Sequence, residues 1–354
     1  MSSGSPSGIV WFDAAEAHDV DLAGGKCRSL AALIAADLPV PPGFVVSTHA
    51  YREALSSVGL DREIEATLAN RDLATPETAE AVARQIAWLL SRQSIPPPLT
   101  GEIARAYSML GEKLGHGSEV SVAVRSSATA EDRTEASFAG QQDTYLNITG
   151  AECVVQAIRE CWASLFSARA LAYRAQRSRW QSGSLAMAVG VQVMVPARAA
   201  GVLFTVNPQT GDTSQLVIEA NWGLGESVVA GLVTPDRYVV DKRTGQTIET
   251  RIGQKSLEVV CGLRGTLHQE VPLPKQGLPC LTLADREHLA EIARRVEALF
   301  GSPQDIEWAF DASDQCFVLQ ARPVTTWPLP RSQSSTPSPA HQDFYRSLGA
   351  GPSK

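Results

Sequence analysis

Two short stretches near the end of the chain decide the fold, Asp305-Ile-Glu-Trp308 and Gln320-Ala-Arg-Pro323. A tight turn midway between them would pair Glu307 with Gln320, and Asp305 with Arg322, in an antiparallel hairpin. Because side chains alternate along a strand, these four polar residues would share one face. The opposite face would hold four large apolar side chains: Trp308, Phe310, Phe317 and Leu319.

The polar face of this hairpin has the chemistry of a site for a metal ion and phosphate. A carboxylate at Glu307 beside an amide oxygen at Gln320 suits Mg²⁺, which takes hard oxygen ligands and shares its shell with substrate phosphates. A guanidinium at Arg322 suits the phosphate itself. Polar residues also alternate on strands whose outer face is simply solvated, so the hairpin alone leaves both interpretations open.

Three other segments have features that favour anions. Gly24-Gly25-Lys26 opens a predicted helix, and a helix N-terminus with a nearby cation attracts phosphate, although the Walker A pattern is missing. Arg125-Ser-Ser-Ala-Thr129 follows the apolar strand pattern Val120–Val124, so it would deliver an arginine and hydroxyls into a loop. An exposed turn with a capping serine is the alternative there. Small residues in Ser137–Thr144 would let backbone amides approach a polyphosphate closely.

Composition places the chain among globular proteins. It has 354 residues, of which 44% are hydrophobic and 19% charged, enough for two domains or one two-lobed domain. A net charge of −7 disfavours nucleic acid or an anionic membrane as the main partner. The six cysteines form no close CxxC pair, which predicts reduced thiols rather than a zinc site. Neither a secretory signal nor an apolar run of about 20 residues is present, so we expect a soluble, cytoplasmic protein.

The order of predicted elements indicates the α/β class with two lobes. Helical patterns dominate the first part, including one long amphipathic helix over Ala151–Arg177. After Gly183 the chain changes to short strand patterns, at Val189–Val195, Gly201–Val206, Gln215–Ala220 and Tyr238–Asp241. We expect an N-terminal lobe over residues 1–185, a C-terminal lobe over residues 186–326 and a disordered, Ser- and Pro-rich tail over residues 327–354. The site is expected in the cleft between the two lobes.

The order of these motifs along the chain resembles the N-terminal nucleotide-binding domain shared by phosphoenolpyruvate synthase, pyruvate phosphate dikinase and rifampicin phosphotransferase. The resemblance covers about residues 9–326. It rests on Gly24-Gly25-Lys26, Val124-Arg-Ser-Ser-Ala-Thr-Ala-Glu-Asp132, Ser137–Thr144, Gly201-Val-Leu-Phe-Thr205, Trp222-Gly-Leu-Gly-Glu226 and the two hairpin stretches. It implies an ATP-grasp fold, in which two α/β lobes clamp ATP with Mg²⁺.

The resemblance also implies roles for individual residues. Lys26 and Arg125 would contact phosphates, and Arg322 would act on the transferring phosphates; these three are the expected catalytic residues. Glu307 and Gln320 would be the metal ligands. Thr144 and the amides of Gly140, Gln141 and Gln142 resemble the loop that covers the phosphates. The segment expected to line the adenine consists of Gln192, Val193, Met194 and Val195.

One part of the family pattern is missing. Full-length relatives carry a further mobile domain whose Thr-Xaa-Gly-Gly…His motif accepts the phosphoryl group, and none of the six histidines here has that context. The phosphohistidine is therefore expected on a separate partner subunit. The short subunit of phenylphosphate synthase is the nearest precedent, which implies a phenolic or alcoholic acceptor and AMP and phosphate as products.

Two other interpretations stay open. The chain could be the ATP domain of a split phosphoenolpyruvate synthase or antibiotic phosphotransferase. It could also be a non-catalytic module that senses nucleotide, although such a module would not need the complete set of transfer residues.

Overall fold

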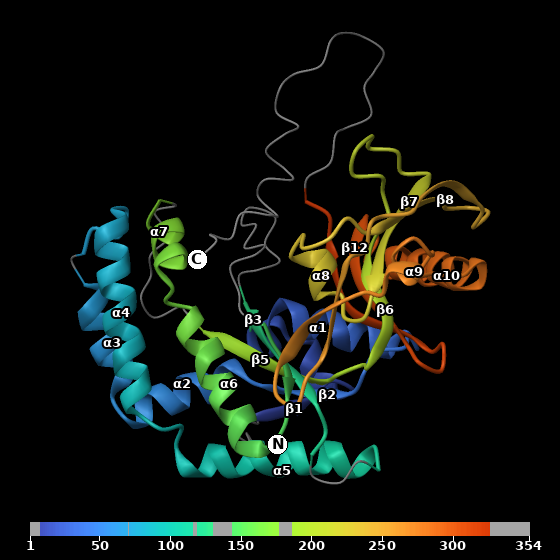
Figure 1. Ribbon diagram of the computed structural model, residues 1–354. Coiled ribbons are helices and arrows are strands. Elements are labelled where there is room, and N and C mark those ends of the chain that lie inside the picture. Colours follow the sequence, from blue (N-terminus) through green and yellow to red (C-terminus); the bar gives the residue numbers. More distant parts are fainter. Residues whose placement is uncertain (1–7, 70, 116–118, 130–143, 177–185, 326–354) are drawn as a thin grey trace. The chain divides into compact units, whose positions relative to one another are not determined.

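The computed structural model describes residues 8–69, 71–115, 119–129, 144–176 and 186–325 (Figure 1). These residues divide into two compact units. Unit 1 comprises Met1–Ala32 and Pro42–Met194, and unit 2 comprises Leu33–Pro41 and Val195–Lys354. The α/β class predicted from the sequence is confirmed, because each unit combines helices with one main sheet.

Unit 1 is built on a five-stranded sheet in the order β1-β2-β5-β3-β4, in which every neighbouring pair is antiparallel. The strands are β1 (Ile9–Trp11), β2 (Gly43–Val46), β3 (Val122–Ala128), β4 (Thr144–Ile148) and β5 (Met187–Val193). Its helical elements are η1 (Ala15–His18), α1 (Val20–Ala35), α2 (Thr48–Ser57), α3 (Leu60–Leu68), α4 (Pro76–Arg92), α5 (Pro97–Lys113), α6 (Ala151–Ser164) and α7 (Ala168–Gln176).

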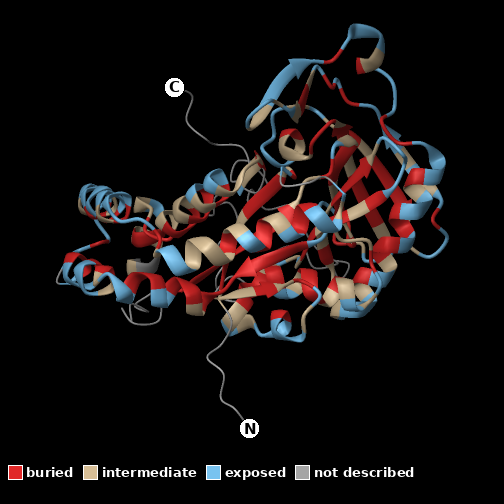
Figure 2. Cartoon of the chain, turned by 90° about the horizontal axis from the view of Figure 1, so that it is seen from below, coloured by how far each residue is buried: buried red, intermediate tan, exposed pale blue. Residues whose placement is uncertain are grey.

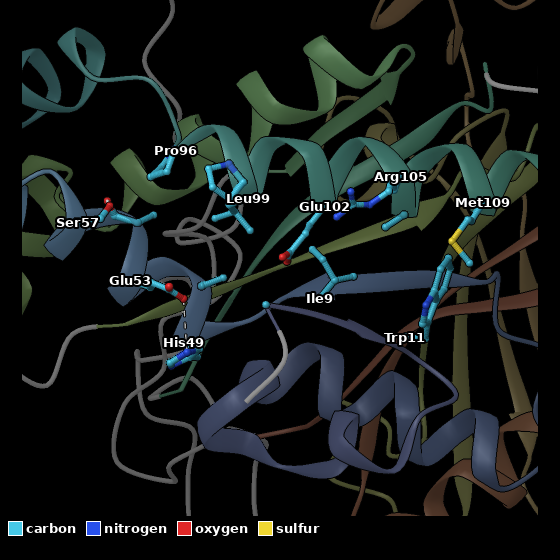
Figure 3. A pocket seen from close by; sticks show the side chains of 15 residues that line it. Ile9, Trp11, His49, Glu53, Ser57, Pro96, Leu99, Glu102, Arg105 and Met109 are labelled. Carbon is cyan, nitrogen blue, oxygen red and sulfur yellow. Dashed lines mark hydrogen bonds and ion pairs between the residues drawn. The ribbon is translucent and has the colours of Figure 1, made fainter. Parts of the chain in front are cut away.

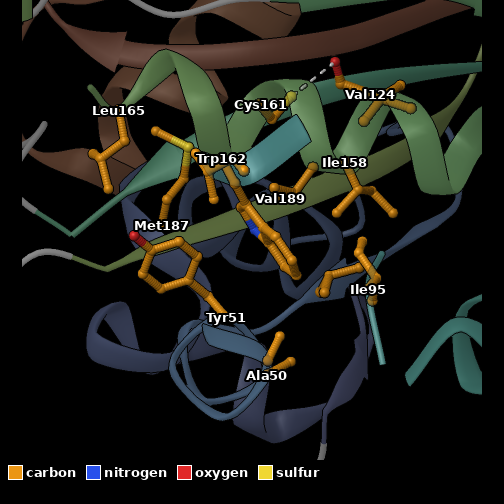
Figure 4. Close-up of a cluster of buried hydrophobic side chains, with 14 of the residues drawn as sticks. Ala50, Tyr51, Ile95, Val124, Ile158, Cys161, Trp162, Leu165, Met187 and Val189 are labelled. Atoms are coloured by element: carbon orange, nitrogen blue, oxygen red, sulfur yellow. Dashed lines mark hydrogen bonds between the residues drawn. The ribbon is translucent and has the colours of Figure 1, made fainter. Parts of the chain in front are cut away.

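Apolar residues at helical spacing explain how the helices of unit 1 pack. On α4, the buried positions Ala79, Val82, Ile86 and Leu90 recur every three or four residues. Figure 4 shows part of the resulting core, where the rings of Tyr51 and Trp162 meet edge to face with centroids 5.5 Å apart. Figure 2 shows that buried residues run along most strands of this sheet, whereas exposed residues lie on the outer faces of the helices.

The single long helix predicted over Ala151–Arg177 is wrong, since the structure has two helices there. α6 ends at Ser164 and α7 begins at Ala168. The side chain of Ser167 accepts a hydrogen bond from the backbone N–H of Ala170 at 3.3 Å, the contact of a helix N-cap. A capping serine therefore restarts the helix, although the apolar period continues across the break.

Unit 2 is built on a six-stranded antiparallel sheet in the order β13-β12-β6-β7-β8-β9, with a separate two-stranded sheet β10-β11. The strands of the main sheet are β6 (Ala197–Phe204), β7 (Gln215–Trp222), β8 (Asp236–Asp241), β9 (Thr247–Arg251), β12 (Gln304–Asp311) and β13 (Cys316–Pro323). The remaining elements are β10 (Leu257–Cys261), β11 (Thr266–Glu270), α8 (Glu226–Val229), α9 (Leu273–Gln276) and α10 (Leu283–Phe300).

Local signals define the ends of α10, the helix that packs on β12 and β13. Thr282 and Asp285 form a reciprocal capping box at its start, and Gly301 ends it in the left-handed conformation with φ 68°. Arg198 reaches this start from β6: it donates hydrogen bonds to Asp285 at 2.7 Å and to Asp314 at 2.6 Å. These contacts link the tip of the β12–β13 hairpin to the helix.

A buried ion pair holds together three further segments of unit 2. Lys255 and Asp236 are both fully buried and lie 2.6 Å apart. The Asp236 carboxylate also accepts hydrogen bonds from the backbone N–H groups of Gly253 and Cys280, both at 2.9 Å. The ammonium and N–H donors around Asp236 compensate for the burial of its carboxylate, so we assign this ion pair a structural role.

The division of the chain also differs from the predicted one. Residues 186–194 belong to unit 1, because β5 pairs with β2 and β3 inside that sheet. Residues 33–41 belong to unit 2, where the carbonyl of Pro39 accepts a hydrogen bond from Val318 at 2.7 Å. The predicted tail, residues 327–354, lies outside the described residues. Across the part that is described, no helix is long and apolar enough to cross a membrane.

Candidate functional site

The start of α1 fits closely against β3 in unit 1. Gly24 has a φ of +71°, and a Cβ there would lie 2.1 Å from the carbonyl oxygen of Ser127, so only glycine fits. The backbone N–H of Cys27 donates to the Ser127 hydroxyl at 3.1 Å, and the ammonium group of Lys26 donates to the carbonyl of Ser126 at 3.2 Å. The glycine pair thus places Lys26 beside the strand that carries Arg125.

Arg125 lies inside β3, not in a loop after it as the sequence suggested. It pairs with Thr144 of β4, and two residues before it Ala123 pairs with Gln192 of β5. Residues that pair directly, or lie two apart on one strand, share a face of the sheet. Arg125, Thr144 and Gln192 therefore share one face of unit 1. Ser127, which contacts α1, lies on that face too.

Among the described residues predicted to line the adenine, Gln192 has a buried side chain with an unpaired hydrogen-bond donor. Its side chain is only 2% exposed, and its Nε2 atom has no hydrogen-bond partner among the described residues. A buried amide donor without an acceptor costs stability, so the Nε2 group of Gln192 is available to donate a hydrogen bond to an acceptor atom of a ligand. Val193 and Met194 are half-buried, whereas Val195 is buried and belongs to unit 2. The predicted loop residues Gly140, Gln141 and Gln142 lie outside the described residues.

At its polar end, the β12–β13 hairpin of unit 2 has the residue pairing that the sequence predicts. Glu307 pairs with Gln320, and Asp305 with Arg322. Arg322 donates through Nε to the Asp305 carboxylate at 2.9 Å, and its Nη2 atom lies 2.7 Å from the same oxygen. The two expected metal ligands therefore lie side by side, next to a guanidinium that is held in place.

The apolar end of the hairpin departs from the prediction. A β-bulge follows Glu307, so Trp308 pairs with Val318 and Ala309 with Phe317. Phe317 and Leu319 consequently pack with Ala309, while Trp308 lies on the other face. The prediction that Phe317 and Leu319 share the face of Trp308 and Phe310 is wrong, because the bulge moves the pairing by one residue.

Asp305 is the residue whose importance the sequence left open. Burial raises the pKa of its carboxyl, the ion pair with Arg322 opposes that shift, and the nearby charge of Glu307 adds to it. Its second oxygen, Oδ1, is buried and has no hydrogen-bond partner among the described residues. Asp305 thus orients Arg322 and keeps one acceptor available.

The pair Glu307 and Gln320 fits a magnesium ion. Each supplies one hard oxygen, and Mg²⁺ commonly takes few protein ligands and completes its shell with phosphate oxygens and water. No group of three or more His, Cys, Asp or Glu side chains within the described ranges could hold a metal ion.

A hollow of about 640 Å³ lies elsewhere in unit 1, beside β1 and between α2 and α5 (Figure 3). Trp11, Glu102 and Met109 line it, together with His49 and Glu53, which lie 3.6 Å apart. None of the predicted site residues lines this hollow.

The chain matches the family model described as pyruvate phosphate dikinase, AMP/ATP-binding domain, over residues 20–342. It is 41% identical over 344 residues to a probable phosphoenolpyruvate synthase of Methanothermobacter thermautotrophicus, covering 97% of this chain and 49% of that protein. The same name belongs to a Methanocaldococcus jannaschii protein that is 44% identical over 319 residues, or 90% of this chain and 27% of that protein. A phosphoenolpyruvate synthase of Aeropyrum pernix is 38% identical, covering 94% of this chain and 44% of that protein. The chain thus spans at most about half the length of these relatives.

Likeness to solved structures is weaker. D-alanyl-alanine synthetase A from Vibrio cholerae aligns with 85% of this chain and 55% of its own at 12% identity, with a TM-score of 0.32. The D-cycloserine synthetase DcsG aligns with 84% of this chain and 62% of its own at 14% identity, with a TM-score of 0.27. The family model and the relatives, in contrast, cover nearly all of the described residues. The chain therefore belongs to the family of pyruvate phosphate dikinase AMP/ATP-binding domains.

Proposed function

We propose that the chain is the ATP-binding, phosphoryl-donating part of a dikinase-type phosphotransferase. The pairing of Glu307 with Gln320, beside the ion pair of Asp305 and Arg322, is the observation that carries this proposal. The overall reaction would be ATP + acceptor + water → AMP + phosphate + phosphorylated acceptor. In it the γ-phosphate is released to water, and the β-phosphoryl group reaches the acceptor.

The proposed roles follow from charge and position. Lys26 and Arg125 would neutralise phosphate oxygens, and Thr144 shares the face of Arg125. Glu307 and Gln320 would hold Mg²⁺, which when bound neutralises phosphate charge. Arg322, oriented by Asp305, would stabilise the charge on the phosphoryl group in transfer. Phosphoryl transfer depends mostly on positioning and charge, which these residues can supply without a nucleophile of their own.

We further propose that the phosphoryl group passes first to a histidine on a separate partner subunit. The similarity to phosphoenolpyruvate synthases favours pyruvate as the final acceptor. A phenolic acceptor, expected from the resemblance to phenylphosphate synthase, is the second candidate.

Isotope labelling tests this function directly. The chain would be incubated with ATP labelled at the β-phosphate, with and without a histidine-bearing partner, and with pyruvate or phenol. We expect label on the partner's histidine and AMP formation only when both proteins are present. AMP formation at the full rate by the chain alone would refute the partner requirement, and the labelled product identifies the acceptor.

A further inference from the structure

One row of side chains crosses the sheet of unit 2 from the proposed metal site. Gln320 pairs with Glu307, Glu307 with Val202, Val202 with Glu219, and Glu219 with Arg237. Directly paired residues share a face, so Glu219 lies on the same face as Glu307. Two strand spacings separate their backbones, roughly 9.5 Å.

The side chain of Glu219 is half-buried and makes no hydrogen bond or ion pair with any other described residue. Its neighbour Arg237 acts on it through its charge, without a direct ion pair. The Arg237 guanidinium donates instead to Gln209 at 3.2 Å and lies 4.0 Å from Glu249. The Glu219 carboxylate is thus partly desolvated, and its oxygens have no protein donor among the described residues, so they can accept hydrogen bonds from a ligand.

The surroundings of Glu219 favour hydroxyl donors over a second metal ion. Its neighbours in the row are Val202, which has no ligand atom, and Arg237, whose positive charge opposes a cation. Mg²⁺ requires several oxygen ligands, whereas a carboxylate alone can accept hydrogen bonds from two hydroxyl groups. If the phosphates of a nucleotide lie beside Glu307 and Gln320, its sugar is the part that can present hydroxyl groups to Glu219.

We infer that Glu219 binds the ribose of the nucleotide by accepting hydrogen bonds from its hydroxyl groups. This inference rests on the proposed ATP site and adds a residue that recognises the sugar. Glu219 would contact the sugar and not the transferring phosphate, so its role is that of a binding residue. It makes the site selective for ribonucleotides.

Binding measurements with sugar analogues test the inference. The chain would be titrated calorimetrically, in the presence of Mg²⁺, with ATP, 2′-deoxy-ATP and 3′-deoxy-ATP. We expect the wild-type chain to bind ATP about 10-fold or more tightly than at least one deoxy analogue, as for a hydrogen bond to a charged group. In the Glu219→Ala chain, ATP affinity should fall by that factor and the discrimination should disappear.

The matched control is Glu249→Ala, which removes a carboxylate of the same sheet that lies near Arg237 and Arg251. This variant should discriminate between the sugars as the wild type does. An equal loss of affinity for all three nucleotides in Glu219→Ala would overturn the inference, as would a change in the Mg²⁺ requirement alone. If the wild type binds ATP without any preference among sugars, only this inference fails; if it binds no ATP, the proposed function fails as well.

Discussion

At the scale of single residues, Gly24 shows how backbone geometry creates the site. A methyl group there would meet the Ser127 carbonyl at 2.1 Å, in a left-handed conformation that side chains disfavour. We expect Gly24→Ala to destabilise the chain by about 1–3 kcal/mol and to weaken ATP binding, because Lys26 loses its place beside β3. Urea unfolding and ATP titration measure the two effects.

Gly59 offers the control for this prediction. It has a similar φ of +73°, but a Cβ there would have no heavy atom within 4 Å. Gly59→Ala should show the conformational cost alone and leave ATP affinity unchanged. Equal effects of both substitutions on ATP affinity would show that the contact between α1 and β3 has no part in binding.

Glu219 should make the stability of the chain depend on pH. Burial raises the pKa of its carboxyl; Arg237 lowers it in part, and the charge of Asp305 raises it further. A carboxyl with a raised folded pKa binds its proton more tightly in the folded state. Its ionisation therefore costs stability, and this cost grows as the pH rises from the unfolded pKa of about 4.3 through the folded pKa.

We expect Glu219→Gln to be more stable than the wild type at pH 7, with the difference vanishing as the pH falls to about 4. Free energies of unfolding in urea at several pH values measure this. A variant that is less stable at pH 7 would show that Glu219 stabilises the folded chain.

Site residues that the sequence predicts are paired by contacts between segments close in the sequence, whereas the residues it does not predict depend on contacts between distant segments. Glu307 and Gln320 lie on two strands joined by a short turn, so local alternation was enough to pair them. Glu219 joins the same face only through the pairing of β6 with β7 and β12, which no local pattern determines. Asp305 was placed correctly, but its ionic contact with Arg322 required side-chain geometry.

At the scale of elements, the sequence predicts the polar end of the β12–β13 hairpin correctly and its apolar end wrongly. The turn and the polar end were predictable, because strand alternation and turn residues are local signals. The bulge was not, because the apolar run Phe317–Leu319 fits either face equally well and only packing with Val195 and Ala200 selects one. The break between α6 and α7 was missed for a similar reason, since the serine that caps α7 lies within an unbroken apolar period.

Arg198 should hold this hairpin to α10. Its guanidinium pairs with Asp285, which is only 7% exposed, and with Asp314, and it lies 5.0 Å from the Phe310 ring. Arg198→Ala leaves the Asp285 carboxylate buried without its cation, so we expect a loss of about 3–5 kcal/mol in the free energy of unfolding. Chemical denaturation measures it.

Arg84→Ala is the matched control, because Arg84 makes an exposed ion pair with Glu80 on α4. That substitution should cost at most about 0.5 kcal/mol. If Arg198→Ala costs no more than the control, the hairpin does not depend on this contact.

At the scale of the whole molecule, the proposed roles can be tested without knowing the acceptor. A ligand that binds only the folded chain raises its stability by mass action, by about 2.7 kcal/mol when the free ligand is at 100 times its Kd. We expect ATP with Mg²⁺ to stabilise the chain in this way, as measured by urea unfolding at fixed nucleotide concentration. Glu307→Ala should lose the part of this stabilisation that depends on Mg²⁺, since it removes one of the two proposed metal ligands.

Arg322→Ala then separates a catalyst from a nucleotide sensor. Arg322 is held by Asp305 next to the proposed metal ligands, so its charge should matter most for the phosphoryl group in transfer. We expect this variant to keep most of the stabilisation by ATP while partner-dependent AMP formation falls by about 100-fold or more. A parallel loss of both would make Arg322 a ground-state binding residue, because a group that acts only in the transition state leaves ATP affinity nearly unchanged. Unchanged AMP formation would remove Arg322 from the catalytic set and leave charge neutralisation to Lys26, Arg125 and the metal ion.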